Sequence, residues 1–147
     1  MTTRTLFIAA LLAVCTPALA QKAEVYSSWL GAAIRGTDPV AYFTEGRPVE
    51  GSRKFMHEWK GATWRFASAA NRDAFAAAPE KYAPQYGGYC AYGVANGYTV
   101  STVPEAWSIV DGKLYLNYSL GVRADWLKDV PGYIRKANAG WPKALER

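Results

Sequence analysis

The chain has 147 residues, with 17 Lys and Arg against 12 Asp and Glu, which gives a formal net charge of +5. Half of the residues are hydrophobic, enough for one well-packed core, and this argues against a disordered chain. The basic residues are scattered rather than gathered into a stripe, so the composition does not support nucleic-acid binding.

The first twenty residues have the layout of a secretory signal peptide. Arg4 provides a short basic start, Leu6 to Val14 form an apolar run, and Ala18-Leu19-Ala20 forms an Ala-x-Ala cleavage site. We therefore expect a signal peptide at 1–20 and a single periplasmic or secreted domain at 21–147. The apolar run is too short to span a bilayer, and no later run approaches that length, so we expect no stable membrane insertion.

After the leader, the chain begins with a lead-in segment at residues 21–36. Apolar residues from Val25 to Ile34 recur at helical spacing, which indicates a short helix within it. Asp38-Pro39 is typical of a helix start, because Asp can cap the free amides and Pro fits the first turn. Gly46 ends this helix after one to two turns.

Alternating aromatic residues predict a β-hairpin over Phe55–Phe66, with its turn at Lys60-Gly61. Ser68 can then cap a helix that runs over 69–78. A second short helical turn follows from Pro79 to Tyr82, and Pro84 ends it.

A second hairpin is predicted over Trp107–Tyr118, because Asp111-Gly112 between two apolar runs is a strong two-residue turn signal. Apolar residues from Val122 onward recur mostly at four-residue steps, and Pro131 interrupts them. We read two helices that meet near Pro131, the second ending at Gly140. The predicted fold class is α+β, with two antiparallel β-hairpins forming a small sheet packed against several short helices.

Taken in order, the short motifs of the chain resemble those of YHS domain proteins, and more narrowly the small exported type. The resemblance implies the same compact fold over nearly all of the chain after the leader, and a link to heavy metals, since some members occur in copper- and mercury-handling proteins. The motifs that carry it are Gly36-Thr37-Asp38-Pro39-Val40-Ala41-Tyr42-Phe43, Phe55-x-His57, Gly61-Ala62-Thr63-Trp64-x-Phe66-x-Ser68, Asn71-Arg72-x-x-Phe75, Pro79-Glu80-Lys81-Tyr82, Gly87-Gly88-Tyr89-Cys90 and Asp111-Gly112-Lys113-Leu114-Tyr115-Leu116-Asn117.

The chain departs from the cysteine-rich members of this family at three positions. Those members read Asp-Pro-Val-Cys and then Phe-Cys-Ser-x-x-Cys, whereas Ala41, Ala67 and Asn71 stand at the corresponding positions here. The thiolate ligands of the metal-binding members are therefore missing, and the resemblance supports the fold more than the metal site.

Cys90 is the only cysteine that remains if the leader is removed, because Cys15 lies within it. A lipoprotein reading would keep Cys15 as a lipid anchor, but the branched Val14 before it disfavours such processing. We expect no intramolecular disulfide. An unpaired cysteine in an oxidising compartment is explained by inert burial, by pairing with another chain, or by metal or redox chemistry.

His57 is the only histidine, and it is either a metal ligand or a half-buried residue that packs on aromatic rings. The Cys90 thiolate, the His57 imidazole and the Met56 thioether are ligands that suit Cu(I). Met56 and His57 point to opposite faces of a strand, so only one of them could share a site with Cys90. We hypothesise a metal site, for copper or another soft ion, in which Cys90 and His57 face each other across one crevice as the Gly87-Gly88 segment packs over the first hairpin.

The sequence thus predicts an exported, non-enzymatic binding or accessory protein that handles copper or another soft metal ion. The alternative is a small-molecule- or protein-binding module without metal, with an aromatic pocket lined by residues such as Tyr42, Trp64, Tyr89 and Tyr92. A thiol or redox protein that uses Cys90 is a weaker alternative, because the chain has no Gly-x-Ser-x-Gly elbow, phosphate loop or His-Glu-x-x-His motif. Converging soft ligands would favour the first function, and a concave aromatic pocket without them would favour the second.

Overall fold

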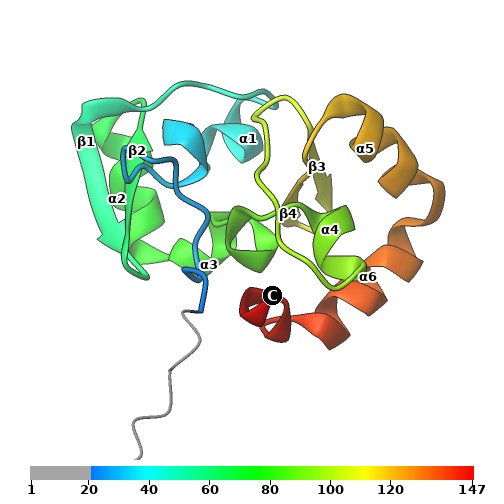
Figure 1. Ribbon diagram of the computed structural model, residues 1–147. Coiled ribbons are helices and arrows are strands. Elements are labelled where there is room, and N and C mark those ends of the chain that lie inside the picture. Colours follow the sequence, from blue (N-terminus) through cyan, green and yellow to red (C-terminus); the bar gives the residue numbers. More distant parts are fainter. Residues whose placement is uncertain (1–20) are drawn as a thin grey trace, which may run out of the picture.

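The computed structural model describes residues 21–147, so the expected signal peptide and Cys15 lie outside the described residues. Two antiparallel hairpins and several short helices make up the fold, which confirms the α+β class (Figure 1). Each hairpin forms its own two-stranded sheet, and short helices lie between the two hairpins (Figure 1).

The first half of the fold holds the first hairpin and the helices around it. Its elements are η1 (Ile34–Gly36), α1 (Ala41–Thr44), β1 (Ser52–Trp59), β2 (Ala62–Phe66), α2 (Ala69–Ala77) and α3 (Pro79–Tyr82). The second half holds the second hairpin and the C-terminal helices. Its elements are η2 (Gln85–Gly88), α4 (Ala91–Ala95), β3 (Trp107–Val110), β4 (Lys113–Leu116), α5 (Leu120–Trp126), η3 (Leu127–Asp129), α6 (Val130–Gly140) and η4 (Lys143–Glu146). None of the helices within 21–147 has the length and apolar character that crossing a bilayer would require.

The lead-in does not form the expected helix. A bridge joins Ser27 to Ala33 around a tight turn, and the Ile34 N–H donates to the Tyr26 carbonyl. Ile34 and Arg35 both have positive φ, at 42° and 60°, which breaks a right-handed helix. Only the 3₁₀ turn η1 is helical in this segment.

Both predicted hairpin turns are confirmed. Lys60 and Gly61 have φ of 50° and 72°, and Asp111 and Gly112 have φ of 50° and 73°, as type I′ turns require. β1 begins at Ser52, three residues earlier than expected, with a shift of register between Ser52 and Met56.

The predicted helix ends are largely confirmed. The Ser68 Oγ accepts from the backbone N–H of Asn71 and caps α2. The Asp129 carboxylate caps α6 by accepting from the Gly132 N–H, and Pro131 occupies the first turn of α6. Pro131 therefore starts the second C-terminal helix, which ends at Gly140 as expected.

The buried side chains form two clusters. The first core centres on Phe75, whose ring lies 5.0 Å from that of Trp64 and 5.1 Å from that of Phe66. The second core centres on Trp126 and Tyr115, with ring centroids 5.3 Å apart. Aromatic pairs at these separations add to the stabilisation that burial itself provides.

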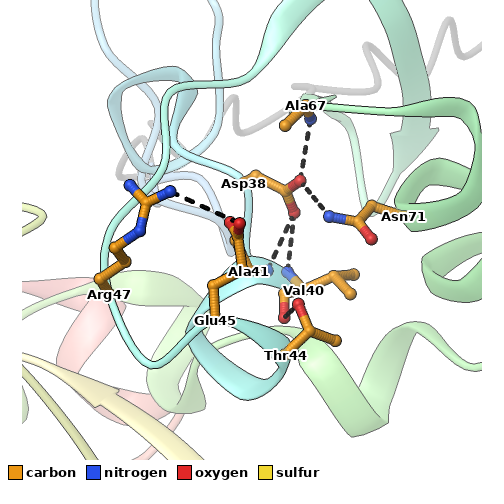
Figure 2. Close-up of polar contacts among 8 residues, drawn as sticks. All are labelled: Asp38, Val40, Ala41, Thr44, Glu45, Arg47, Ala67 and Asn71. Carbon is orange, nitrogen blue, oxygen red and sulfur yellow. Dashed lines mark hydrogen bonds and ion pairs between the residues drawn. The ribbon is translucent and has the colours of Figure 1, made fainter.

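The carboxylate of Asp38 links α1 to the start of α2. It is fully buried, and its Oδ1 accepts from the N–H groups of Val40 at 2.9 Å and Ala41 at 3.3 Å. Its Oδ2 accepts from the Ala67 N–H and from the Asn71 Nδ2, both at 2.8 Å (Figure 2). Four N–H donors thus satisfy one buried carboxylate, which fixes both the turn that leads into α1 and the loop after β2. The N-cap of α1 itself is Val40, two residues later than predicted, and no side chain caps it.

We expect Gly112→Val to lower the free energy of unfolding by about 1–3 kcal/mol, because a branched residue is strained at positive φ. No atom of the described residues, other than those of Gly112 and its chain neighbours, lies within 4 Å of the added Cβ, so the expected cost comes from backbone conformation. Asp111→Asn is the control, since Asn is favoured in this turn and should change little. Denaturant titration measures both, and an unchanged midpoint for Gly112→Val would contradict the turn's role.

We expect Asp38→Ala to destabilise the protein by about 3–5 kcal/mol, because it leaves two buried and two partly buried N–H donors without an acceptor. Glu45→Ala removes a nearby exposed carboxylate, whose one ion-pair partner among residues 21–147 is Arg47, at 3.4 Å (Figure 2). This control should stay within about 0.5 kcal/mol of the wild type. Similar losses for the two variants would show that the four hydrogen bonds do not hold the fold.

Candidate functional site

A groove of about 470 Å³ lies between the two cores. Its walls come from the lead-in, the turn between β1 and β2, the segment from α3 to η2, and the end of α6. Four aromatic residues line it: Trp59, Trp64, Tyr86 and Trp141. Concave sites between packed units, lined by aromatic side chains, are where small molecules commonly bind.

The first hairpin supplies the tryptophans of one wall. Trp59 ends β1 and Trp64 lies on β2, with ring centroids 5.9 Å apart. The Trp64 Nε1–H donates to the Trp59 carbonyl at 3.1 Å, which fixes the indole and satisfies its polar atom. Trp64 is fully buried and forms the floor, whereas Trp59 is partly exposed.

Tyr86 and Trp141 supply the opposite wall. Their ring centroids are 6.0 Å apart, and the Tyr86 hydroxyl donates to the Asn138 Oδ1 at 2.8 Å. Burial raises the pKa of Tyr86 well above its ordinary value, so the hydroxyl stays protonated and remains a donor.

The lead-in crosses close to η2 beside this groove. Gly87 has a φ of 63°, and a Cβ at this position would overlap the Glu24 carbonyl oxygen. The Tyr26 N–H donates to the Gly87 carbonyl at 2.8 Å, and the Tyr89 hydroxyl donates to the Ala23 carbonyl at 2.8 Å. Gly87 is therefore the tight-approach point that the sequence indicated, and its partner is the lead-in rather than the first hairpin.

Three charged residues line the groove. The Lys60 Nζ lies 2.7 Å from the Glu24 Oε1 and 4.9 Å from the centroid of the Trp59 ring. Glu80, in the first turn of α3, has no ion-pair partner within residues 21–147. The groove thus combines aromatic walls with one paired and one unpaired carboxylate.

Cys90 lies away from this groove, at the start of α4. It is a free thiol, 1% exposed, whose Sγ–H donates to the Asn117 Oδ1 at 3.4 Å. Its sulfur also accepts from the Tyr118 N–H at 3.3 Å. Burial raises the pKa of this thiol, although nearby backbone N–H groups oppose the effect, so the neutral form is favoured.

His57 lies on β1, opposite Trp64, and is half-buried with its ring 6.1 Å from that of Phe75. Met56 is 46% exposed on the other face of the strand. β1 and α4 lie on opposite sides of the molecule (Figure 1). The contacts do not bring His57 to Cys90, so their shared metal site stays a prediction that the geometry does not support.

The positions where the resemblance places metal-binding cysteines surround the Asp38 carboxylate (Figure 2). Ala41 and Ala67 have no side-chain ligand atom, and Asn71 uses its amide to donate to Asp38. These residues do not fit a thiolate metal site. Within residues 21–147, no three His, Cys, Asp or Glu side chains gather as a metal would require.

Sequence reasoning identified Trp64 as a pocket residue but misplaced the other three. The Tyr42 hydroxyl donates to the Pro104 carbonyl beside the first core, Tyr89 contacts the lead-in, and Tyr92 packs on Tyr133. The sequence analysis missed Tyr86, Trp141 and the three charged residues of the groove, because the groove is formed by segments that lie far apart in the sequence. Gly87 was the one signal in the sequence that could have located the groove, since a glycine is often required where two backbone segments approach closely.

Residues 40–86 match the family model of the YHS domain. No curated protein and no solved structure matches the chain. The family is associated with metal binding, copper in particular. The matched span supplies Trp59, Trp64 and Tyr86 to the groove, while Glu24 and Trp141 come from outside it. The chain therefore contains a YHS domain, at residues 40–86.

Proposed function

We propose that this chain is an exported, non-enzymatic binding protein that holds a small organic molecule in the groove between its two cores. The observation that carries the proposal is the aromatic lining of a cavity of about 470 Å³. Sites for small molecules commonly have volumes of about 300–1,000 Å³ and apolar walls with a few polar groups. Export rests on the signal-peptide layout of residues 1–20.

The polar groups of the groove favour binding over catalysis. The Trp64 indole and the Tyr86 hydroxyl are engaged by other parts of the fold, and Lys60 is paired with Glu24. The described residues that line the groove include no Cys, His or Ser, the usual nucleophiles and bases. The groove therefore offers a surface that can contact and orient a ligand, and not a nucleophile with a neighbouring general base.

Copper handling through Cys90 is the second candidate. Its support is the association of the family with metals and the N–H groups that surround the sulfur, since such donors stabilise a thiolate. The Asn117 carboxamide and the Tyr118 backbone are the immediate neighbours of the sulfur, so a soft ion would need further ligands from another molecule.

We expect the wild type to bind the neutral fluorescent probe N-phenyl-1-naphthylamine, with Trp141→Ala weakening the affinity about tenfold. Truncation of a central aromatic contact commonly costs more than about 1 kcal/mol. Trp29→Ala is the matched control, because Trp29 is 93% exposed and does not line the groove. Equal affinities for all three proteins would place the binding site elsewhere.

The copper candidate predicts that Cys90→Ser loses most Cu(I) uptake, because a hydroxyl is a poor ligand for a soft ion. His57→Ala should lose less, and both variants should stay folded. Equilibrium dialysis with Cu(I) and circular dichroism measure the two effects. Equal copper uptake by the wild type and Cys90→Ser would rule out copper handling through Cys90. Small-molecule binding in the groove would then remain as the proposed function.

A further inference from the structure

We infer that the groove selects a small organic cation with an apolar body, such as an aryl-alkyl amine, over neutral or anionic molecules of the same shape. The inference rests on the proposed function and assigns the charge of the ligand. It follows from the balance of charge inside the groove, from the character of its walls and from the pairing of its one basic residue among residues 21–147.

The local charge of the groove is opposite to that of the chain. The chain has a net charge of +5, yet among residues 21–147 the charged residues that line the groove are Glu24, Glu80 and Lys60, for a local sum of −1. Lys60 and Glu24 neutralise each other at 2.7 Å. The Glu80 carboxylate is left as the uncompensated charge, on the α3 side of the groove.

The walls already bind one cation of this chain. The Lys60 Nζ lies 4.9 Å from the Trp59 ring centroid, within the range at which a ring face attracts a positive charge. Trp141, partly exposed at the other side of the groove, offers a second indole. A ligand ammonium near Glu80 would therefore gain both a carboxylate and aromatic partners.

An anion would find little to bind. Lys60 is the one basic residue among those lining the groove within residues 21–147, and its charge is shared between Glu24 and the Trp59 ring. Pro84 contributes no N–H, and the Tyr86 hydroxyl donates to Asn138. The carboxamides of Gln85 and Asn138 also line the groove, but they are neutral donors. A carboxylate ligand would thus meet two carboxylates and a single cation that is already paired.

Isothermal titration at pH 7 with three probes of nearly equal size tests the inference: phenethylamine, 2-phenylethanol and phenylacetate. We expect phenethylamine to bind about three- to tenfold more tightly than 2-phenylethanol, as a cation does beside a carboxylate and ring faces. Phenylacetate should bind most weakly. Added salt should reduce the preference for the amine.

Glu80→Gln should abolish the preference for the amine, so that phenethylamine and 2-phenylethanol bind with similar affinities. Glu50→Gln is the matched control, because it removes an exposed carboxylate that does not line the groove, and it should keep the preference. Equal binding of amine and alcohol, or tighter binding of phenylacetate, overturns the inference and leaves the proposed function standing. If none of the three probes and no N-phenyl-1-naphthylamine binds, the proposed function fails as well.

Discussion

The close approach of the lead-in to Gly87 is the contact on which the groove depends. Residues 22–26 hydrogen-bond to η2, to Tyr89 and to the carbonyl of Leu145 in the C-terminal turn, and Glu24 pairs with Lys60 of the first hairpin. One extended segment therefore connects both cores. Because a side chain at Gly87 would overlap the Glu24 carbonyl, the spacing of the groove walls is set by the absence of a Cβ at a single position.

The Asp38 carboxylate holds together the part of the fold where the family resemblance would place metal-binding cysteines. Four N–H groups converge on this buried charge, and they join α1, the end of β2 and the start of α2. Asn71 contributes a donor where cysteine-rich members have a thiol. The same place in the fold is held together by hydrogen bonds, so the binding chemistry of this chain is better sought in the groove.

Local signals in the sequence predicted the local structure well. Asp111-Gly112 and Lys60-Gly61 identified both turns, and Ser68 identified the start of α2, because each acts on backbone within a few residues of itself. The incorrect predictions concern contacts between segments that lie far apart in the sequence. Helical spacing in the lead-in was overridden by its pairing with η2, and the groove unites Trp59 and Trp141, whose proximity no local pattern encodes. Cys90 and His57 drew attention as single residues of their kinds, yet their surroundings are apolar packing and backbone amides.

The most direct test of the account is native mass spectrometry of the protein isolated from its own compartment without denaturation. We expect a chain that begins at Gln21 and carries one small organic molecule, at lower occupancy in Trp141→Ala and at unchanged occupancy in Cys90→Ser. A chain that carries stoichiometric copper, lost in Cys90→Ser and retained in Trp141→Ala, would contradict it.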